Sequence, residues 1–196
     1  MTSSKKWMLF IAGALLVYHF DVITGSWKFN RLCKNEGGPR FYGPVEKNVG
    51  WEVASNDIHG YQYPFPFGDI AFVRYQDKQG VRSDVRMEGY KQTSPNYREP
   101  NYVFSPVDTA LSIRYRFQYT DASFPEDERF SKSVHQVTDL RSGRVVATYT
   151  QFGFSWTKSE RVLLGAPTGN LCPDGVDEET SYRAFVKNIY DFRSTR

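Results

Sequence analysis

Four aromatic residues at alternating positions are the feature of the sequence that most suggests binding chemistry. They are Tyr61, Tyr63, Phe65 and Phe67. Their rings could stack on a sugar or anchor a protein partner. Pro64 and Pro66 lie between them and cannot donate to a sheet, so we expect an edge strand or a polyproline-like stretch over residues 60–69. We favour the alternative that the rings cover the open side of a β core, because an exposed aromatic row is a liability without a partner.

Two arginines, Arg114 and Arg116, lie on the polar side of the clearest strand pattern. A guanidinium group pairs well with carboxylate or phosphate, so the two could seat an anion. More often such a pair simply meets carboxylates of neighbouring strands, and the acidic stretch over residues 126–128 is one source. Together with the four aromatic residues, these arginines form the candidate ligand or partner surface.

The chemistry of catalysis leaves no pattern in this chain. We find no nucleophile elbow, phosphate loop, dinucleotide-binding glycines or zinc-ligand spacing, and therefore expect no catalytic residue, cofactor or metal. A site assembled from distant strands leaves no local motif, so a hydrolase stays an alternative. Its first residues to test are His59, Asp69 and His135.

The two cysteines, Cys33 and Cys172, each lie beside turn-forming residues, where two backbones can approach. In an oxidising compartment we expect a disulfide between them, closing a loop of about 140 residues and contributing about 4 to 5 kcal/mol. The alternative is two buried thiols that never meet, as in a reducing compartment.

The first part of the chain resembles a targeting segment. Lys5 and Lys6 precede an uncharged apolar run over residues 7–18, which is shorter than the ~20 residues that span a bilayer comfortably. Extending it to Ile23 gives about 17 residues, and no A-x-A cleavage site follows, so we favour an uncleaved anchor over a cleaved signal. A buried core helix is less favoured, because such helices seldom lack a polar face over this length.

We therefore divide the chain into residues 1–26, a membrane anchor or signal segment, and residues 27–196, a single extracytoplasmic β-rich domain. The membrane contact is made through residues 7–23. The basic residues on the two sides of the segment nearly cancel, but a long C-terminal domain can be translocated regardless of its charge. We expect inner-membrane anchoring with the domain in the periplasm, or a secreted or periplasmic protein if the signal is cleaved.

The elements behind these residues are mostly strands. Two hairpins are expected, one over residues 70–87 and one over residues 133–156, with Gly143 at a positive φ in the second turn. Three prolines make residues 90–106 a predicted long loop. Residues 110–120 alternate as a strand with one buried face. A final helix is predicted from apolar residues at helical spacing: Tyr182, Phe185, Val186, Ile189 and Tyr190.

The expected class is α+β, mainly antiparallel β, with an N-terminal hydrophobic helix, a twisted sheet with hairpins, and a C-terminal amphipathic helix packed on the sheet. Aromatic residues make up 16% of the 196 residues, which favours strands over a helical bundle. The formal net charge of +3 is small, and the basic residues are interleaved with acidic ones, so we expect no nucleic-acid partner.

The order of these features resembles small uncharacterised bacterial envelope proteins. The resemblance rests on the Leu32-Cys33 and Gly37-Gly38 patch after the hydrophobic segment, and on the hairpin from Asp139 to Gly143. It implies an extracytoplasmic setting and no activity. Our leading hypothesis is a membrane-tethered, non-catalytic module that binds another envelope protein; the alternative is a small-ligand or glycan-binding domain with an aromatic surface.

Overall fold

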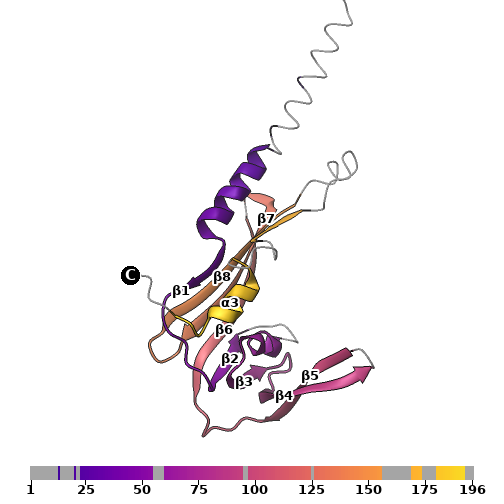
Figure 1. Cartoon of the computed structure of the whole chain (residues 1–196), viewed down its shortest axis with the longest axis vertical. Helices are drawn as coiled ribbons and strands as arrows, with labels where there is room; N and C mark the ends of the chain where they lie inside the picture. Colours follow the sequence, from indigo (N-terminus) through magenta and orange to yellow (C-terminus); the bar gives the residue numbers. More distant parts are fainter. Residues whose placement is uncertain are drawn as a thin grey trace, which may run out of the picture.

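The structure is a computed structural model, and it describes residues 13, 20, 23–54, 60–94, 97–124, 126–155, 169–173 and 180–192. One mixed sheet of nine strands fills most of these ranges (Figure 1). A helix over residues 23–36 lies at one end of the molecule, and the short helix α3 (Tyr182–Asn188) packs on the sheet. The expected α+β class is confirmed.

The strands follow one another mostly as hairpins. In chain order they are β1 (Gly38–Phe41), β2 (Val49–Ala54), β3 (Ile70–Gln76), β4 (Arg82–Ser94), β5 (Tyr97–Pro106), β6 (Ile113–Phe124), β7 (Asp127–Asp139), β8 (Arg144–Phe154) and β9 (Asn170–Cys172). Their order across the sheet is β1-β8-β7-β6-β2-β3-β4-β5, and β9 also pairs with β8. β2 is parallel to both its neighbours, β3 and β6, whereas the other pairs are antiparallel.

The larger core lies on the face of the sheet that α3 covers, where α3 packs against β1 and β8. Trp51 of β2 and Tyr115 and Phe117 of β6 are fully buried there. α3 contributes Phe185, and Ile189 follows it, both also fully buried. The Ser181 hydroxyl accepts a hydrogen bond from the Ala184 N–H and begins the helix. The predicted C-terminal amphipathic helix is therefore confirmed.

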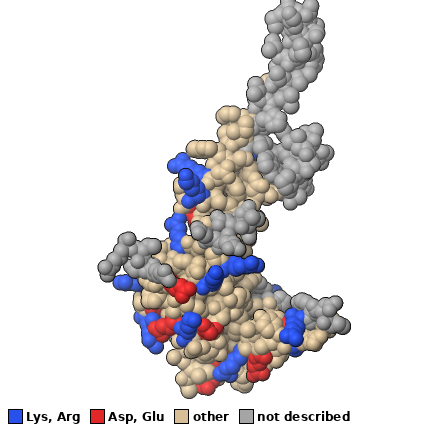
Figure 2. Space-filling view, viewed as in Figure 1, with Lys and Arg blue, Asp and Glu red and all other residues tan. Residues whose placement is uncertain are grey.

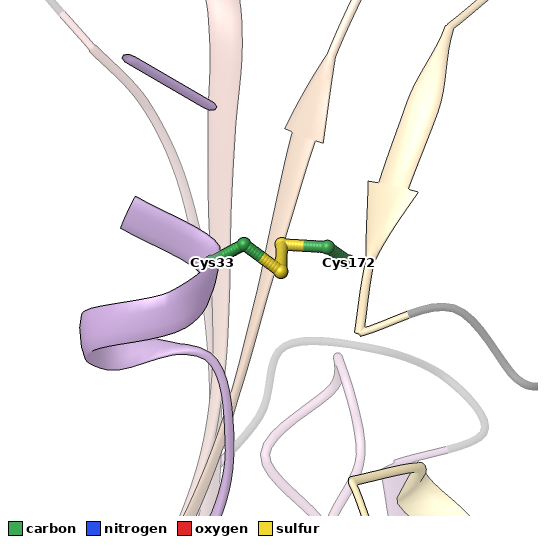
Figure 3. Close-up of a disulfide and its surroundings, with 2 residues drawn as sticks. All are labelled: Cys33 and Cys172. Atoms are coloured by element: carbon green, nitrogen blue, oxygen red, sulfur yellow. A yellow bond between two sulfur atoms is a disulfide. The ribbon is translucent and has the colours of Figure 1, made fainter. Parts of the chain in front are cut away.

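A second, smaller core joins the helix over residues 23–36 to β7, β8 and β9. Phe29 of the helix packs against Phe154, with ring centroids 6.0 Å apart. Cys33 and Cys172 form a disulfide across this junction, with Cα atoms 5.8 Å apart (Figure 3). The predicted disulfide is confirmed, and it favours a non-cytoplasmic, oxidising compartment.

Two predictions about local structure are wrong. The described residues of the range 90–106 are not a loop: residues 90–94 belong to β4 and residues 97–106 form β5, its partner in a long hairpin. Pro100 and Pro106 are tolerated because β5 ends the strand order, and a proline on an edge strand need not donate to a ladder. Residues 60–69 form two short 3₁₀ turns, η1 (Gly60–Gln62) and η2 (Phe65–Phe67), rather than an edge strand or a polyproline-like stretch.

The hairpins over residues 70–87 and 133–156 are confirmed as β3–β4 and β7–β8, and Gly143 has the expected positive φ of 69°. The strand over residues 110–120 is confirmed as β6. The predicted N-terminal hydrophobic helix lies largely outside the described residues. Within the described ranges, no helix combines the length and apolar character needed to cross a membrane.

Candidate functional site

The far end of the aromatic row, in η2, lies in the core. Phe65 and Phe67 are 6% and 5% exposed. Phe67 stacks on Trp51 at 5.5 Å and meets Phe185 edge-on at 5.4 Å. These two rings cover the sheet, as the second interpretation of the row expects, and they are not available to a partner.

Tyr63 is partly buried and packs on β6 and β7. Its ring lies 5.9 Å from that of Tyr119 and 6.1 Å from that of Phe117. The ring of His135 approaches it edge-on at 6.5 Å. Tyr63 therefore closes one side of the core.

Tyr61 differs from the rest of the row because it leans toward the open edge of the sheet. Its ring meets Tyr75 of β3 at 5.4 Å, and Tyr102 and Phe104 of β5 at 5.2 and 5.1 Å, each nearly perpendicular. The row thus continues onto the β4–β5 hairpin, a connection that sequence reasoning missed.

We call this extension the aromatic arm and define it as Tyr61, Tyr90, Tyr102 and Phe104. Tyr90 is 64% exposed and Phe104 is 51% exposed. A bulge places Tyr90 on the same side as Tyr102: the register passes from the Met87–Tyr102 pair to the Tyr90–Pro100 pair, with one extra residue in β4. Gly89 takes a positive φ of 79° there, which a glycine adopts freely.

The two faces of the β4–β5 hairpin carry different side chains. Alternation puts Lys91 and Glu99 on the face away from the aromatic arm, and their side chains form an ion pair at 3.1 Å. On the aromatic face, burial raises the pKa of Tyr102, and the neighbouring Tyr61 and Tyr90 raise it further. The Tyr102 hydroxyl therefore stays neutral at physiological pH.

The predicted arginines have protein partners. Arg114 Nη1 lies 2.9 Å from Asp139 Oδ1, and its Nη2 lies 3.2 Å from Glu46 Oε1. Arg116 donates to Glu52 on the neighbouring strand β2. The carboxylates thus come from Glu46, Glu52 and Asp139, and not from residues 126–128. Both guanidinium groups have counter-ions within the protein.

Asp139 is held as a carboxylate at the end of β7. Burial opposes its ionisation, but hydrogen bonds from the Arg141 N–H and from Ser142, together with the charge of Arg114, outweigh it. The pKa of Asp139 is therefore held below its ordinary value. This arrangement fixes the β7–β8 turn and explains Arg114 as a structural residue.

The residues named for the hydrolase alternative do not form a site in the described structure. His59 lies outside the described residues. His135 lies among aromatic rings, closest to Tyr182 at 4.8 Å, and its burial lowers its pKa to about 4. Asp69 pairs with Lys47 at 2.9 Å instead. Over the described ranges, no three His, Cys, Asp or Glu residues gather as a metal site.

A groove of about 800 Å³ lies beside the disulfide, between the helix over residues 23–36 and β9. Lys34 is the one charged residue among the described residues that line it. The described residues of its lining offer a single positive charge and no convergent acid and base, so they indicate no particular reaction.

Sequence reasoning identified Tyr61 but missed Tyr90, Tyr102 and Phe104. The signal was the alternation of Tyr102 and Phe104, which the prolines at 100 and 106 obscured. A comparison of the chain with protein-family models, with curated proteins and with solved structures finds no match to any of the three.

Proposed function

We propose that the protein is a membrane-tethered, extracytoplasmic module without catalytic activity, and that it binds another envelope protein on the aromatic arm. The observation that carries the proposal is the pair of exposed rings, Tyr90 and Phe104, on one face of a hairpin at the sheet edge. Large exposed apolar side chains grouped on one surface are typical of interaction sites. Aromatic residues are also enriched in the energetically important part of protein interfaces.

The base of the arm is already ordered by the core, which lowers the cost of binding. Tyr61 and Tyr102 are partly buried against the core and hold the inner part of the arm in place. A partner would therefore order few further side chains on this protein. Because the Tyr102 hydroxyl is neutral, covering it carries no cost of burying a charge.

The tether is supported by the basic and apolar start of the chain and by the disulfide. The helix over residues 23–36 and the β4–β5 hairpin lie at opposite ends of the molecule (Figure 1). A chain anchored before residue 23 would present the aromatic arm away from the bilayer, where a partner can reach it.

A photo-crosslinking amino acid tests the surface in native membranes. We expect the crosslinker at position 90 to capture a discrete envelope protein, because Tyr90 lies on the aromatic face. The same crosslinker at position 103 is the control, since Val103 is also exposed, at 38%, on the opposite face of β5. Equal capture at both positions, or background alone, would overturn the proposal.

Substitutions test the energy of the same contact. Tyr90→Ser and Phe104→Ser should each lower partner affinity by roughly tenfold or more, the loss typical of an aromatic anchor at an interface. Val103→Ser is the matched control and should leave the affinity unchanged. Circular dichroism of each variant checks that the sheet is retained.

Glycan or small-ligand binding is the alternative function that would use the same rings. A thermal-shift screen of sugars, cell-wall fragments and lipids separates the two, because a ligand of the folded state raises the melting temperature with concentration. A response that Tyr90→Ser abolishes would favour the alternative over a protein partner.

A further inference from the structure

The helix over residues 23–36 has two faces with different surroundings. Phe29 and Cys33 face the sheet, through the Phe154 ring and the disulfide. Gly25 lies so close to the sheet that an added Cβ would come within 2.7 Å of the Phe154 ring. This side of the helix therefore packs on the protein, with the groove described above beside it, and Lys34 borders that groove as well.

The opposite side carries a stripe of large or basic exposed residues, which we define as Phe20, Ile23, Trp27, Arg31 and Lys34. The smaller polar residues Thr24, Asn30 and Asn35 and the acidic Glu36 are also exposed on this helix. At 100° per residue the four positions from Ile23 to Lys34 fall within an arc of about 80°. The first three are apolar and 67%, 65% and 65% exposed, while the last two are basic. The stripe changes from apolar to basic in the direction away from the N-terminus.

This order matches the passage from hydrocarbon to headgroups at a membrane surface. At 1.5 Å per residue, Trp27 lies about 6 Å beyond Ile23 along the helix, and Lys34 lies about 10 Å further. Tryptophan is enriched at the level of the headgroups, and basic side chains just beyond it are attracted to anionic lipids. The Arg31 guanidinium lies 5.6 Å from the Trp27 ring, so the two residues already form one unit.

The surroundings of the stripe agree with a lipid surface as its occupant. The uncharged run over residues 7–18 precedes it in the sequence, separated from Ile23 by a short stretch that includes His19 and Asp21, so the exposed apolar residues follow closely on an apolar segment. On the face shown in Figure 2, Lys and Arg side chains lie near this helix as well as over the rest of the molecule, whereas Asp and Glu lie mostly toward the opposite end.

We propose that the stripe seats in the interface of a bilayer containing anionic phospholipid, with Trp27 at the headgroup level and Arg31 and Lys34 against the phosphates. This inference rests on the tether of the proposed function and adds a second, lipid-binding surface to it. The disulfide fixes the seated helix to β9, so the sheet has a set orientation on the membrane. The aromatic arm is thereby held away from the lipid.

Fluorescence quenching in vesicles tests the depth of Trp27. The full chain is reconstituted in mixed vesicles of phosphatidylglycerol and phosphatidylcholine, in which the phosphatidylcholine acyl chains carry bromine near the headgroup end. Subtracting the signal of Trp27→Phe isolates Trp27 from the other three tryptophans. We expect strong quenching of the Trp27 component and none of Trp51, which is fully buried in the core. An unquenched Trp27 component overturns the proposal.

The preference for anionic lipid is tested by comparing brominated phosphatidylglycerol with brominated phosphatidylcholine at equal mole fraction. Enrichment around the stripe should make the brominated phosphatidylglycerol about twofold more effective, and Arg31→Gln with Lys34→Gln should abolish the difference. Arg82→Gln is the control, because Arg82 is exposed and belongs to β4, near the other end of the molecule. Equal quenching by the two lipids in the unmodified chain would contradict the role of the basic residues.

Vesicle flotation distinguishes this inference from the proposed function. If the full chain does not float with vesicles, the tether itself is refuted. If it floats and Trp27 stays unquenched, only the interfacial stripe is refuted, and the aromatic arm remains to be tested by crosslinking.

Discussion

The carboxylate of Asp84 is the most completely buried charge in the described sheet. Its oxygens accept from Arg74 Nε at 2.7 Å and Nη2 at 2.9 Å, and from the Asp108 N–H at 3.0 Å. Burial opposes its ionisation, but these hydrogen bonds outweigh burial and hold its pKa below the ordinary value. The pair joins β3 to β4 at the base of the aromatic arm and therefore fixes the direction in which the arm projects.

Removing one partner of this pair should destabilise the fold strongly. We expect Asp84→Ala to lower the free energy of unfolding by about 3 kcal/mol, because it leaves the nearly buried Arg74 without a counter-ion. Glu99→Ala is the control: its ion pair with Lys91 is exposed, so the loss should stay below about 1 kcal/mol. Urea unfolding of the full chain in detergent measures both, and equal losses would contradict this account.

His135 is surrounded by rings and has a buried Nδ1 without a hydrogen-bond partner. Its nearest neighbours are Tyr182 at 4.8 Å and Tyr119 at 5.0 Å. Burial favours the neutral imidazole and lowers its pKa from 6.5 to about 4. The residue is thus a packing element of the core, rather than a base placed for catalysis.

This burial predicts a loss of stability in mild acid. As the pH falls from 6.5 toward 4, the unfolded chain binds a proton at His135 and the folded chain does not, so stability decreases; below about 4 the loss ends. We expect a decrease of about 2 kcal/mol between pH 7 and pH 5, which His135→Phe should remove. The carboxylates with lowered pKa, such as Asp84, act only below this window. Urea titrations at pH 7 and pH 5 measure the free energy of unfolding at each pH. If the free energy falls as much in His135→Phe as in the unmodified chain, this account is refuted.

The elements that sequence reasoning found are those whose local pattern agrees with their surroundings. The β7–β8 hairpin combines alternation with Gly143 at its turn, and α3 shows helical spacing of its buried residues. The prediction of a loop in place of β5 was wrong because prolines, which are excluded from central strands, are tolerated in a strand at the edge of a sheet. The parallel insertion of β2 between β3 and β6 depends on contacts distant in sequence, and no local pattern encodes it.

The same reasoning explains how much of the candidate site was visible. Tyr61 stood out because its segment is dense in aromatic residues, but the fate of each ring depends on tertiary packing. Two 3₁₀ turns rotate Phe65 and Phe67 inward, while Tyr61 meets β5. Alternation predicts that the two arginines lie on the polar face of their strand, but their ion-pair partners come from residues distant in sequence and are visible only in the folded structure.

The junction between the helix over residues 23–36 and the sheet should depend on its disulfide. The bridge joins residues 139 apart, and removing it by Cys33→Ser with Cys172→Ser should cost about 4 kcal/mol in the chain-entropy account. Urea unfolding with and without reductant measures this loss. Reductant should destabilise the unmodified chain and leave the double variant unchanged; matching midpoints for the two chains without reductant would contradict the prediction.

Across the molecule, the structure separates the two surfaces that we assign. The helix with its exposed stripe lies at one end, and the aromatic arm at the other, with the long strands β6, β7 and β8 between them (Figure 1). At about 3.4 Å per residue, the 12 residues of β6 alone extend about 40 Å. A rigid sheet of this length can hold a binding surface clear of the lipid headgroups.

This arrangement requires the whole domain to lie outside the cytoplasm, and the two cysteines report on that directly. Intact cells are treated with a membrane-impermeant thiol reagent, with and without prior reduction. We expect labelling only after reduction, because Cys33 and Cys172 are paired. Cys172→Ser is the control: it leaves the partly buried Cys33 as a free thiol, which should label without reduction. If the unmodified chain labels only after lysis, and then without reduction, the domain faces the cytoplasm, and the tether orientation and the envelope partner are refuted together.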